Sequence, residues 1–222
     1  MTYVELVAEI QNYTQNYESQ FVATIPTFVM QAEERIYNSV QIPALRRNVT
    51  GVTFGGNKYL SCPSDFLASF SLAVIDTDGN YEYLLNKDVN FMRAAYPNPN
   101  DEGLPKYYSL FGPTVVGETV TPELSFILAP TPDDAYDVEL HYYYYPESIT
   151  TAGNSWLGDN YSPVLLYGSL VEAYTYMKGE QDIMAFYDKK YTEALGQLNR
   201  LGTGLERGDA YRDGQAKIKV NP

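Results

Sequence analysis

The residue most suited to chemistry is the single histidine, His141, which lies in the run Glu139-Leu140-His141-Tyr142. A serine or cysteine nucleophile normally needs such a general base beside it. A histidine inside a tyrosine-rich strand is more often structural, and we interpret His141 in that way. No Gly-x-Ser-x-Gly elbow occurs. Cys62, the only cysteine, precedes Pro63 without a basic neighbour, and we interpret it as a small core residue.

Two further segments resemble ligand-binding loops only in part. Asp76–Asn80 has the acidic opening of a calcium loop, but its glycine is at position four and Lys87 replaces the glutamate of position twelve. This favours a tight turn. The glycines at 202, 204 and 208 follow a predicted helix and miss the spacing of both nucleotide-binding fingerprints, so they predict a helix stop.

Carboxylates are too numerous to single out an acid and base pair, and Asp133-Asp134 after Pro132 is typical of a turn. We therefore expect no catalytic residue, no cofactor and no metal. An enzyme would need a deep pocket in which carboxylates converge on a sugar or a metal.

Charge limits the partners of the chain. Its 222 residues, 45% hydrophobic, can bury a core, and 15 Lys and Arg against 28 Asp and Glu give a formal charge of -13. An acidic surface repels phosphate, which argues against tight DNA binding. An acidic wall would, however, suit a conduit through which DNA slides without sticking.

The sequence indicates a soluble protein without a membrane segment. Met1–Gln11 contains two glutamates and no lysine or arginine, unlike a secretory signal. The longest apolar stretches, 70–75 and 163–170, fall short of the roughly 20 residues that a membrane helix needs. A single cysteine fits a reducing cytosol.

Tyrosine is unusually frequent, with 22 residues. Tyrosine offers a large contact area with a polar end and is favoured at interfaces. It is also a strong strand former, so a tyrosine-rich β domain explains the composition equally well. Both interpretations stay open.

Helical periodicity occurs at the two ends of the chain. Thr2 and Glu5 have the spacing of a capping box, which predicts a helix through residue 16. Pro26 suits the first turn of a second helix that ends near residue 41. Ser162 and Pro163 can begin a third, which ends at residue 179, and residues 180–201 predict a fourth.

The middle of the chain is rich in strand signals. Residues 49–54 and 58–61 predict one hairpin, and 71–76 and 81–85 predict a second around Asp78-Gly79. Asn86 can cap a short helix that ends at Tyr96. Further predicted strands are Tyr107–Phe111, Leu124–Leu128 and Tyr136–Tyr145.

These elements predict an α+β fold, in which the N- and C-terminal helices form an antiparallel bundle with an inserted antiparallel β-sheet domain and an extended C-terminal tail. The expected boundaries are 1–43 and 157–207 for the bundle, 44–156 for the insert and 208–222 for the tail.

Several stretches of the sequence resemble the head-to-tail adaptor (connector) proteins of tailed bacteriophages, and they are also similar to the tail tubular protein A of short-tailed phages. The stretches that carry the resemblance are Met1–Tyr13, Ile25–Asn48, Tyr59–Leu67, Leu104–Gly112, Glu139–Ile149 and Trp156–Glu180.

The resemblance implies a structural virion protein without enzymatic activity, in the neck between capsid and tail, assembled in the host cytoplasm. It implies a homo-oligomeric ring, a dodecamer, that docks under the portal protein, extends the DNA channel and offers a surface to a downstream tail or nozzle protein. DNA would be a non-specific passenger.

In such adaptors the C-terminal tail reaches into the portal. By position, the resemblance therefore implies portal-binding residues near the end of this chain, namely Tyr211, Arg212, Lys217, Ile218, Lys219 and Val220.

Two other functions remain open besides that of an enzyme. A tail-tube or tail-completion subunit would differ from an adaptor only in its neighbours in the virion. A carbohydrate-binding module could use tyrosine faces of the insert, but it would not explain four flanking amphipathic helices.

Overall fold

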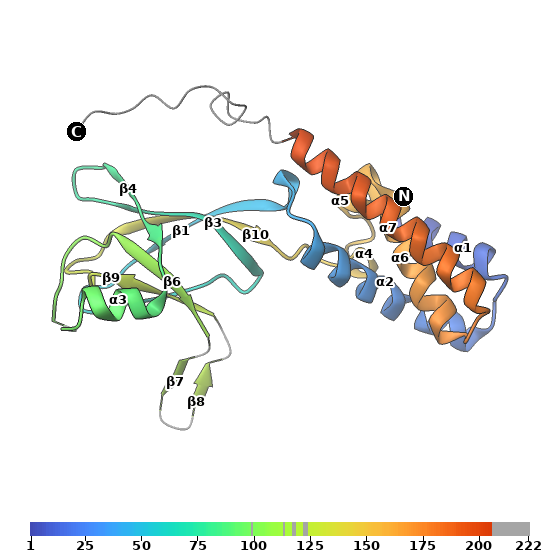
Figure 1. Ribbon diagram of the computed structural model, residues 1–222, viewed down its shortest axis with the longest axis horizontal. Coiled ribbons are helices and arrows are strands. Elements are labelled where there is room, and N and C mark those ends of the chain that lie inside the picture. The colour runs from blue at the N-terminus through green and yellow to red at the C-terminus, as the bar shows by residue number, and fades with distance from the viewer. Residues whose placement is uncertain (99, 113, 117–118, 122–123, 206–222) are drawn as a thin grey trace. The chain divides into compact units, whose positions relative to one another are not determined.

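The computed structural model describes residues 1–98, 100–112, 114–116, 119–121 and 124–205 (Figure 1). Contacts divide the chain into a helical unit, Met1–Leu45 with Pro146–Pro222, and a β unit, Arg46–Tyr145. The mixture of helices and antiparallel-rich sheets confirms the predicted α+β class. This β unit is narrower than the expected insert, because residues 146–156 group with the helices. The expected tail, 208–222, lies outside the described residues.

The helical unit is built around α6 (Ser162–Tyr176), which contacts four other helices. These are α1 (Tyr3–Thr14), α2 (Ser19–Ser39), α5 (Trp156–Asn160) and α7 (Gln181–Leu205). The short elements η1 (Pro43–Leu45) and α4 (Ile149–Ala152) complete the unit. Its most deeply buried side chains are aliphatic and aromatic, among them Leu6, Ile10, Phe21, Ile25, Ile36, Leu165, Leu170 and Leu198.

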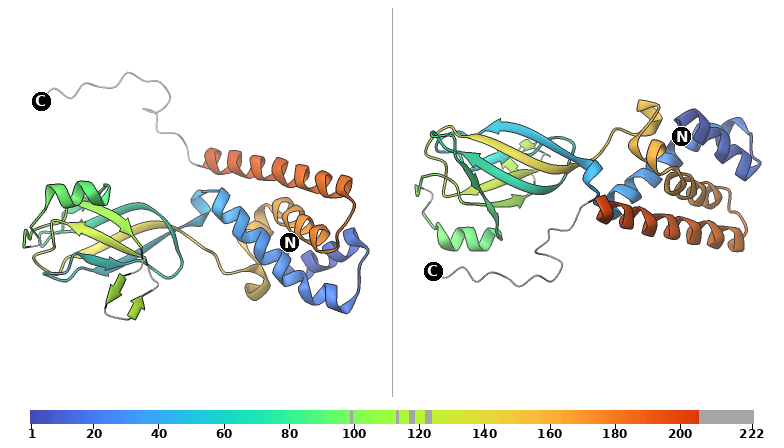
Figure 2. Two further views of the ribbon diagram at one scale, coloured as in Figure 1. Left: turned by 60° about the horizontal axis from the view of Figure 1, so that its bottom comes forward. Right: turned by 90° about the horizontal axis from the view of Figure 1, so that it is seen from above.

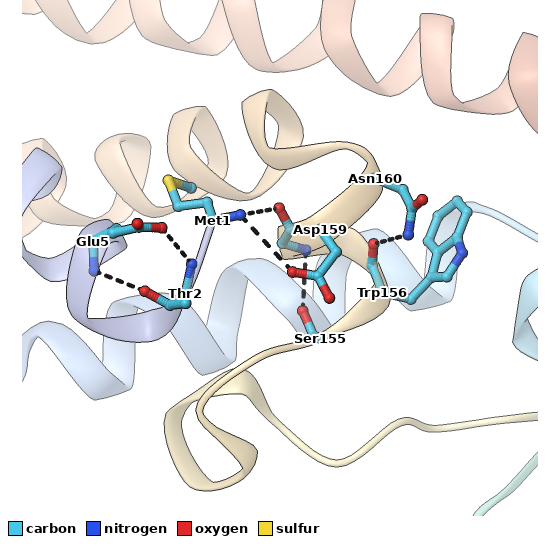
Figure 3. A network of polar contacts seen from close by, with 8 residues as sticks. Met1, Thr2, Glu5, Ser155, Trp156, Asp159 and Asn160 are labelled. Atoms are coloured by element: carbon cyan, nitrogen blue, oxygen red, sulfur yellow. Dashed lines mark hydrogen bonds and ion pairs between the residues drawn. The ribbon is translucent and has the colours of Figure 1, made fainter.

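The predicted capping box at the start of α1 is present (Figure 3). Thr2 Oγ1 accepts from the Glu5 amide at 3.3 Å, and Glu5 Oε2 accepts from the Thr2 amide at 2.8 Å. The Met1 amino group donates to the Gly158 carbonyl at 2.6 Å, and Ser155 Oγ accepts from the Gly158 amide. The first residues are therefore held against α5.

Two predicted helix ends are wrong, because packing overrides local signals. α2 begins at Ser19, so Pro26 lies inside the helix, where the burial of Phe21 and Ile25 offsets the missing backbone donor. α7 continues past Gly202 and Gly204, which were expected to stop it. A Cβ on Gly202 would overlap Ile42 Cγ2, so glycine here permits the close approach of α7 to the segment before η1.

The β unit contains ten strands among the described residues, arranged in two four-stranded sheets and one hairpin. The first sheet has the order β1 (Arg46–Val52), β10 (Asp137–Tyr144), β3 (Phe66–Ile75), β4 (Tyr81–Tyr83). The second has the order β2 (Tyr59–Ser61), β9 (Ser125–Ala129), β6 (Tyr107–Phe111), β5 (Leu85–Asn86). The hairpin consists of β7 (Thr114–Val116) and β8 (Thr119–Thr121).

Both large sheets contribute to one core. Leu72, Val138 and Leu140 come from the first sheet, and Tyr108 and Phe126 come from the second. α3 (Val89–Ala95) contacts β6 and is capped by the side chain of Asp88, not by Asn86 as predicted. The predicted strands at 107–111, 124–128 and 136–145 are present within one residue at each end.

The two predicted hairpins have different outcomes. β3 and β4 do pair as a hairpin, with Ile75 opposite Tyr81, and Gly79 in the connecting turn has φ 86°. The hairpin predicted for 49–61 is wrong. β1 pairs with β10 and β2 pairs with β9, so these neighbours in sequence belong to different sheets.

One carboxyl group is buried in the helical unit. Glu33 on α2 is 3% exposed, and its Oε1 accepts from the Ile149 amide at 3.0 Å, at the start of α4. Desolvation by burial raises the pKa of Glu33, while hydrogen bonds from Ser148 and Ile149 oppose the shift. Because the folded-state pKa is raised, the ionised form at neutral pH costs stability, and protonation on acidification relieves that cost.

Glu33→Gln should therefore raise the midpoint of thermal unfolding near neutral pH by removing a buried charge while keeping an acceptor for Ile149. The gain should shrink as the pH falls through the raised pKa, where the wild-type carboxyl becomes neutral. Circular dichroism melts over a pH series check this. Glu34→Gln, at the exposed neighbouring position, serves as the control and should show no such trend. A pH-independent gain would contradict the burial argument.

Substitutions at two glycines of α7 test the close approach of this helix to Ile42. Gly202→Ala should destabilise the chain by about 1–3 kcal/mol, because the added methyl overlaps Ile42. Gly196→Ala has no atom within 4 Å of the added methyl and should stabilise by up to about 1 kcal/mol through helix propensity. Urea unfolding of both variants measures the difference, and equal effects would rule out the contact.

Candidate functional site

The single histidine lies between a serine and a glutamate on the outward side of the first sheet. His141 Nδ1 lies 3.4 Å from Ser71 Oγ, and Nε2 lies 3.1 Å from Glu139 Oε1. Glu139 also accepts from Asn48 at 2.6 Å, which is the largest cause of its lowered pKa, and it accepts from Tyr81 as well. These contacts run laterally across four strands, so they join neighbouring strands of the sheet and agree with a structural His141.

Cys62 and the Asp76–Asn80 segment also have surroundings that give them structural roles. Cys62 is buried, and desolvation raises the pKa of its thiol to about 12, so it holds little reactive thiolate at neutral pH. Asp76 Oδ1 accepts from the amides of Asp78 and Asn80, which forms the predicted turn. Within the described residues, no three or more His, Cys, Asp or Glu side chains are placed to hold a metal ion.

The outward side of the first sheet carries an aromatic surface. Phe70, Tyr81 and Tyr83 are all about half exposed or more, and the two tyrosines stack at 6.1 Å. The Arg46 guanidinium lies 4.0 Å from the Phe70 ring and donates to Tyr143 Oη at 2.6 Å. Aromatic side chains with an arginine are the composition of protein-binding surfaces.

Tyrosine serves both of the purposes that its frequency suggested. Tyr108 and Tyr142 are buried, and Tyr142 donates to Asp65 at 2.8 Å. Desolvation, with the hydrogen bond to Asp65 second, raises the pKa of Tyr142 to about 12. Tyr17 and Tyr83 are instead mostly exposed. The composition therefore reflects a tyrosine-rich core and tyrosine-bearing surfaces together.

The first sheet has an open edge at β1. Among the described strands, β1 pairs with β10 alone, and six of its seven residues are exposed. Behind this edge a cleft of about 230 Å³ opens toward the core. Its apolar lining comes from both sheets and includes Val49, Leu60, Phe126, Val138 and Leu140.

The helical unit has exposed apolar surface of its own. Val4 on α1 is 76% exposed and Phe186 on α7 is 54% exposed. A separate open groove is lined by Trp156, the only tryptophan, together with Pro43, Ala44, Asn160 and Leu201. Exposed aromatic and aliphatic side chains on both units are consistent with a protein that contacts partners through surfaces.

The portal-binding residues expected from the resemblance, Tyr211 to Val220, lie outside the described residues. The open edge of β1 and the β7–β8 hairpin were missed by sequence reasoning. The hairpin had a usable signal, since Thr114–Val116 and Thr119–Thr121 are β-branched throughout. The edge had none, because only the pairing of distant strands decides which strand ends a sheet.

No helix in the described part of the chain combines the length and hydropathy needed to cross a membrane.

Comparison with known proteins identifies the chain at the level of its family. A search of curated proteins finds no match. The profile described as SU10 adaptor protein matches residues 1–216, almost the entire chain. The chain therefore belongs to the SU10 adaptor protein family, a family of structural adaptor proteins of bacteriophages.

Proposed function

We propose that the chain is a head-to-tail adaptor whose copies form a ring, a dodecamer, in the neck of the virion. The ring docks under the portal protein, extends the DNA channel and offers an attachment surface to a downstream tail or nozzle protein. The observation that carries the proposal is the family match over residues 1–216. In this proposal the N- and C-terminal helices form an antiparallel bundle that serves as the frame of the ring.

The distribution of exposed apolar side chains supports a role in assembly. Both units carry such side chains, from Val4 on α1 to Phe70 on β3. A subunit of a ring must contact two neighbouring copies as well as the components above and below it. Several separate contact surfaces on one small chain are therefore what this function requires.

The acidic composition supports the role of DNA as a passenger. A charge of -13 per copy is multiplied in a ring, and a wall of this sign repels the phosphate backbone. DNA can then slide through the channel without binding to it.

The C-terminal residues are proposed to bind the portal, with Tyr211, Arg212, Lys217, Ile218, Lys219 and Val220 as the contacts. Ordering ten residues costs roughly 15 kcal/mol at about 1.5 kcal/mol per residue, so one tail binds weakly. Several tails on one ring act at a high effective concentration, and together they hold the ring firmly.

Deletion of residues 209–222 should leave a folded protein that no longer associates with portal. The deletion begins beyond the last described helical residue, so the circular dichroism spectrum and melting temperature should match those of the full chain. Pull-down with purified portal measures the association, and an unchanged yield would refute the tail assignment.

A matched pair of variants separates tail contacts from general charge effects. Lys217→Ser with Lys219→Ser should weaken portal association at least about tenfold if these residues contact portal. Lys189→Ser with Lys190→Ser removes the same charge from α7 and should leave association unchanged. Binding of the full chain to a tail-tube protein but not to portal would instead favour the tail-completion alternative, and with it the similarity to tail tubular protein A.

A further inference from the structure

The edge at β1 lacks the usual protection of an exposed strand. Natural sheets protect their edges with charges, proline, bulges or very short strands. β1 has seven residues in unbroken register with β10, from Arg46 opposite Tyr143 to Val52 opposite Asp137. It contains no proline, and its last five residues, 48–52, are uncharged. β1 therefore presents an outer row of backbone groups that can pair with another strand.

The cleft behind β1 adds an apolar site to this edge. Val49 and Gly51 of β1 line it together with the core residues Phe126, Val138 and Leu140. Side chains of a strand alternate between its two faces, so every second residue of an added strand would point toward this cleft. A valine or a residue of similar size fits within about 230 Å³.

The strands of the β7–β8 hairpin also have outer edges that are available for pairing. Among the described residues its two strands pair only with each other, with Val115 opposite Val120. It extends away from the ends of β6 and β9 (Figures 1 and 2). A two-stranded hairpin alone is marginally stable in water, and a third strand is what it needs. The paired positions hold only threonine and valine, so the hairpin carries no charge at these positions.

We propose that the β7–β8 hairpin of one copy adds to the β1 edge of the next copy and covers the cleft. A second copy is the occupant because the hairpin and the edge are both present in one chain and, in the part that the structure describes, do not pair with each other. Each copy then gives a hairpin to one neighbour and receives one from the other. Such a heterologous contact repeats around a closed ring. The inference rests on the proposed ring and names the contact that builds it.

Charge favours this pair of surfaces over others. Each copy carries a charge of -13, so two copies repel each other over most of their surfaces. The uncharged stretch of β1 and the uncharged strands of the hairpin can approach with the least repulsion. Association through them should strengthen as added salt screens the remaining repulsion, in contrast to a contact made by ion pairs.

Sedimentation velocity of the full chain over a concentration and salt series tests the proposal. One variant replaces residues 113–123 by Asn-Gly, which turns β6 directly into β9 and keeps their pairing. A second, Thr50→Lys, puts a charge on the exposed edge, where Glu139 directly opposite on β10 can accommodate it. Both should raise the dissociation constant of self-association at least about tenfold, with unchanged circular dichroism. Thr77→Lys, in the exposed β3–β4 turn, should associate like the wild type.

Hydrogen exchange supplies a local measurement. On association of the wild type, the amides of β1 and of residues 114–121 should exchange more slowly, whereas those of β4 should not change. A wild type that stays monomeric, or variants that associate normally, would overturn the hairpin contact. If the variant without the hairpin still forms rings, this inference alone is refuted. If the wild-type chain self-associates but does not bind portal, the portal-docking function alone is refuted.

Discussion

The β unit depends on the pairing of β10 with strands that lie far from it in sequence. Arg46 at the start of β1 lies opposite Tyr143, and Ser71 on β3 lies opposite His141. β10 thus occupies the interior of the first sheet, and it contributes Val138 and Leu140 to the core. The same pairing leaves β1 outermost. The open edge, the cleft behind it and the aromatic outward face are therefore all consequences of the position of β10.

The helical unit relies on close approaches that small side chains permit. A Cβ on Gly168 would lie 3.1 Å from Ala32 Cβ and 3.2 Å from Tyr191 Cε2, so α6 passes close to both α2 and α7. Gly202 has the same role against Ile42. Larger residues would separate the helices and open cavities between them. Gly168 thus explains how α6 can lie close to α2 and α7 at the same time.

Polar groups that suggest chemistry in the sequence are used to join elements in the structure. Asn48 on β1 contacts Glu139 on β10, and His141 on β10 contacts Ser71 on β3. Asp65 accepts from Arg47 at 2.7 Å and from Tyr142 at 2.8 Å. Buried or partly buried polar groups satisfied in this way specify strand register. The exposed surfaces of both units, which carry aromatic and aliphatic side chains, are left for interaction with other proteins.

The sequence by itself determined the α+β class, the capping box of Thr2, the turn at Asp76–Asn80 and most strand positions, because capping, turns and periodicity depend on residues close together in the chain. The sequence misplaced the start of α2, near Pro26, and the end of α7, near Gly202, because packing outweighs local preference at both places. Only the tertiary structure decided which strands pair, and therefore that β1 is an edge. Strand pairing joins residues about ninety positions apart, and their complementarity leaves no signal in any short window of sequence.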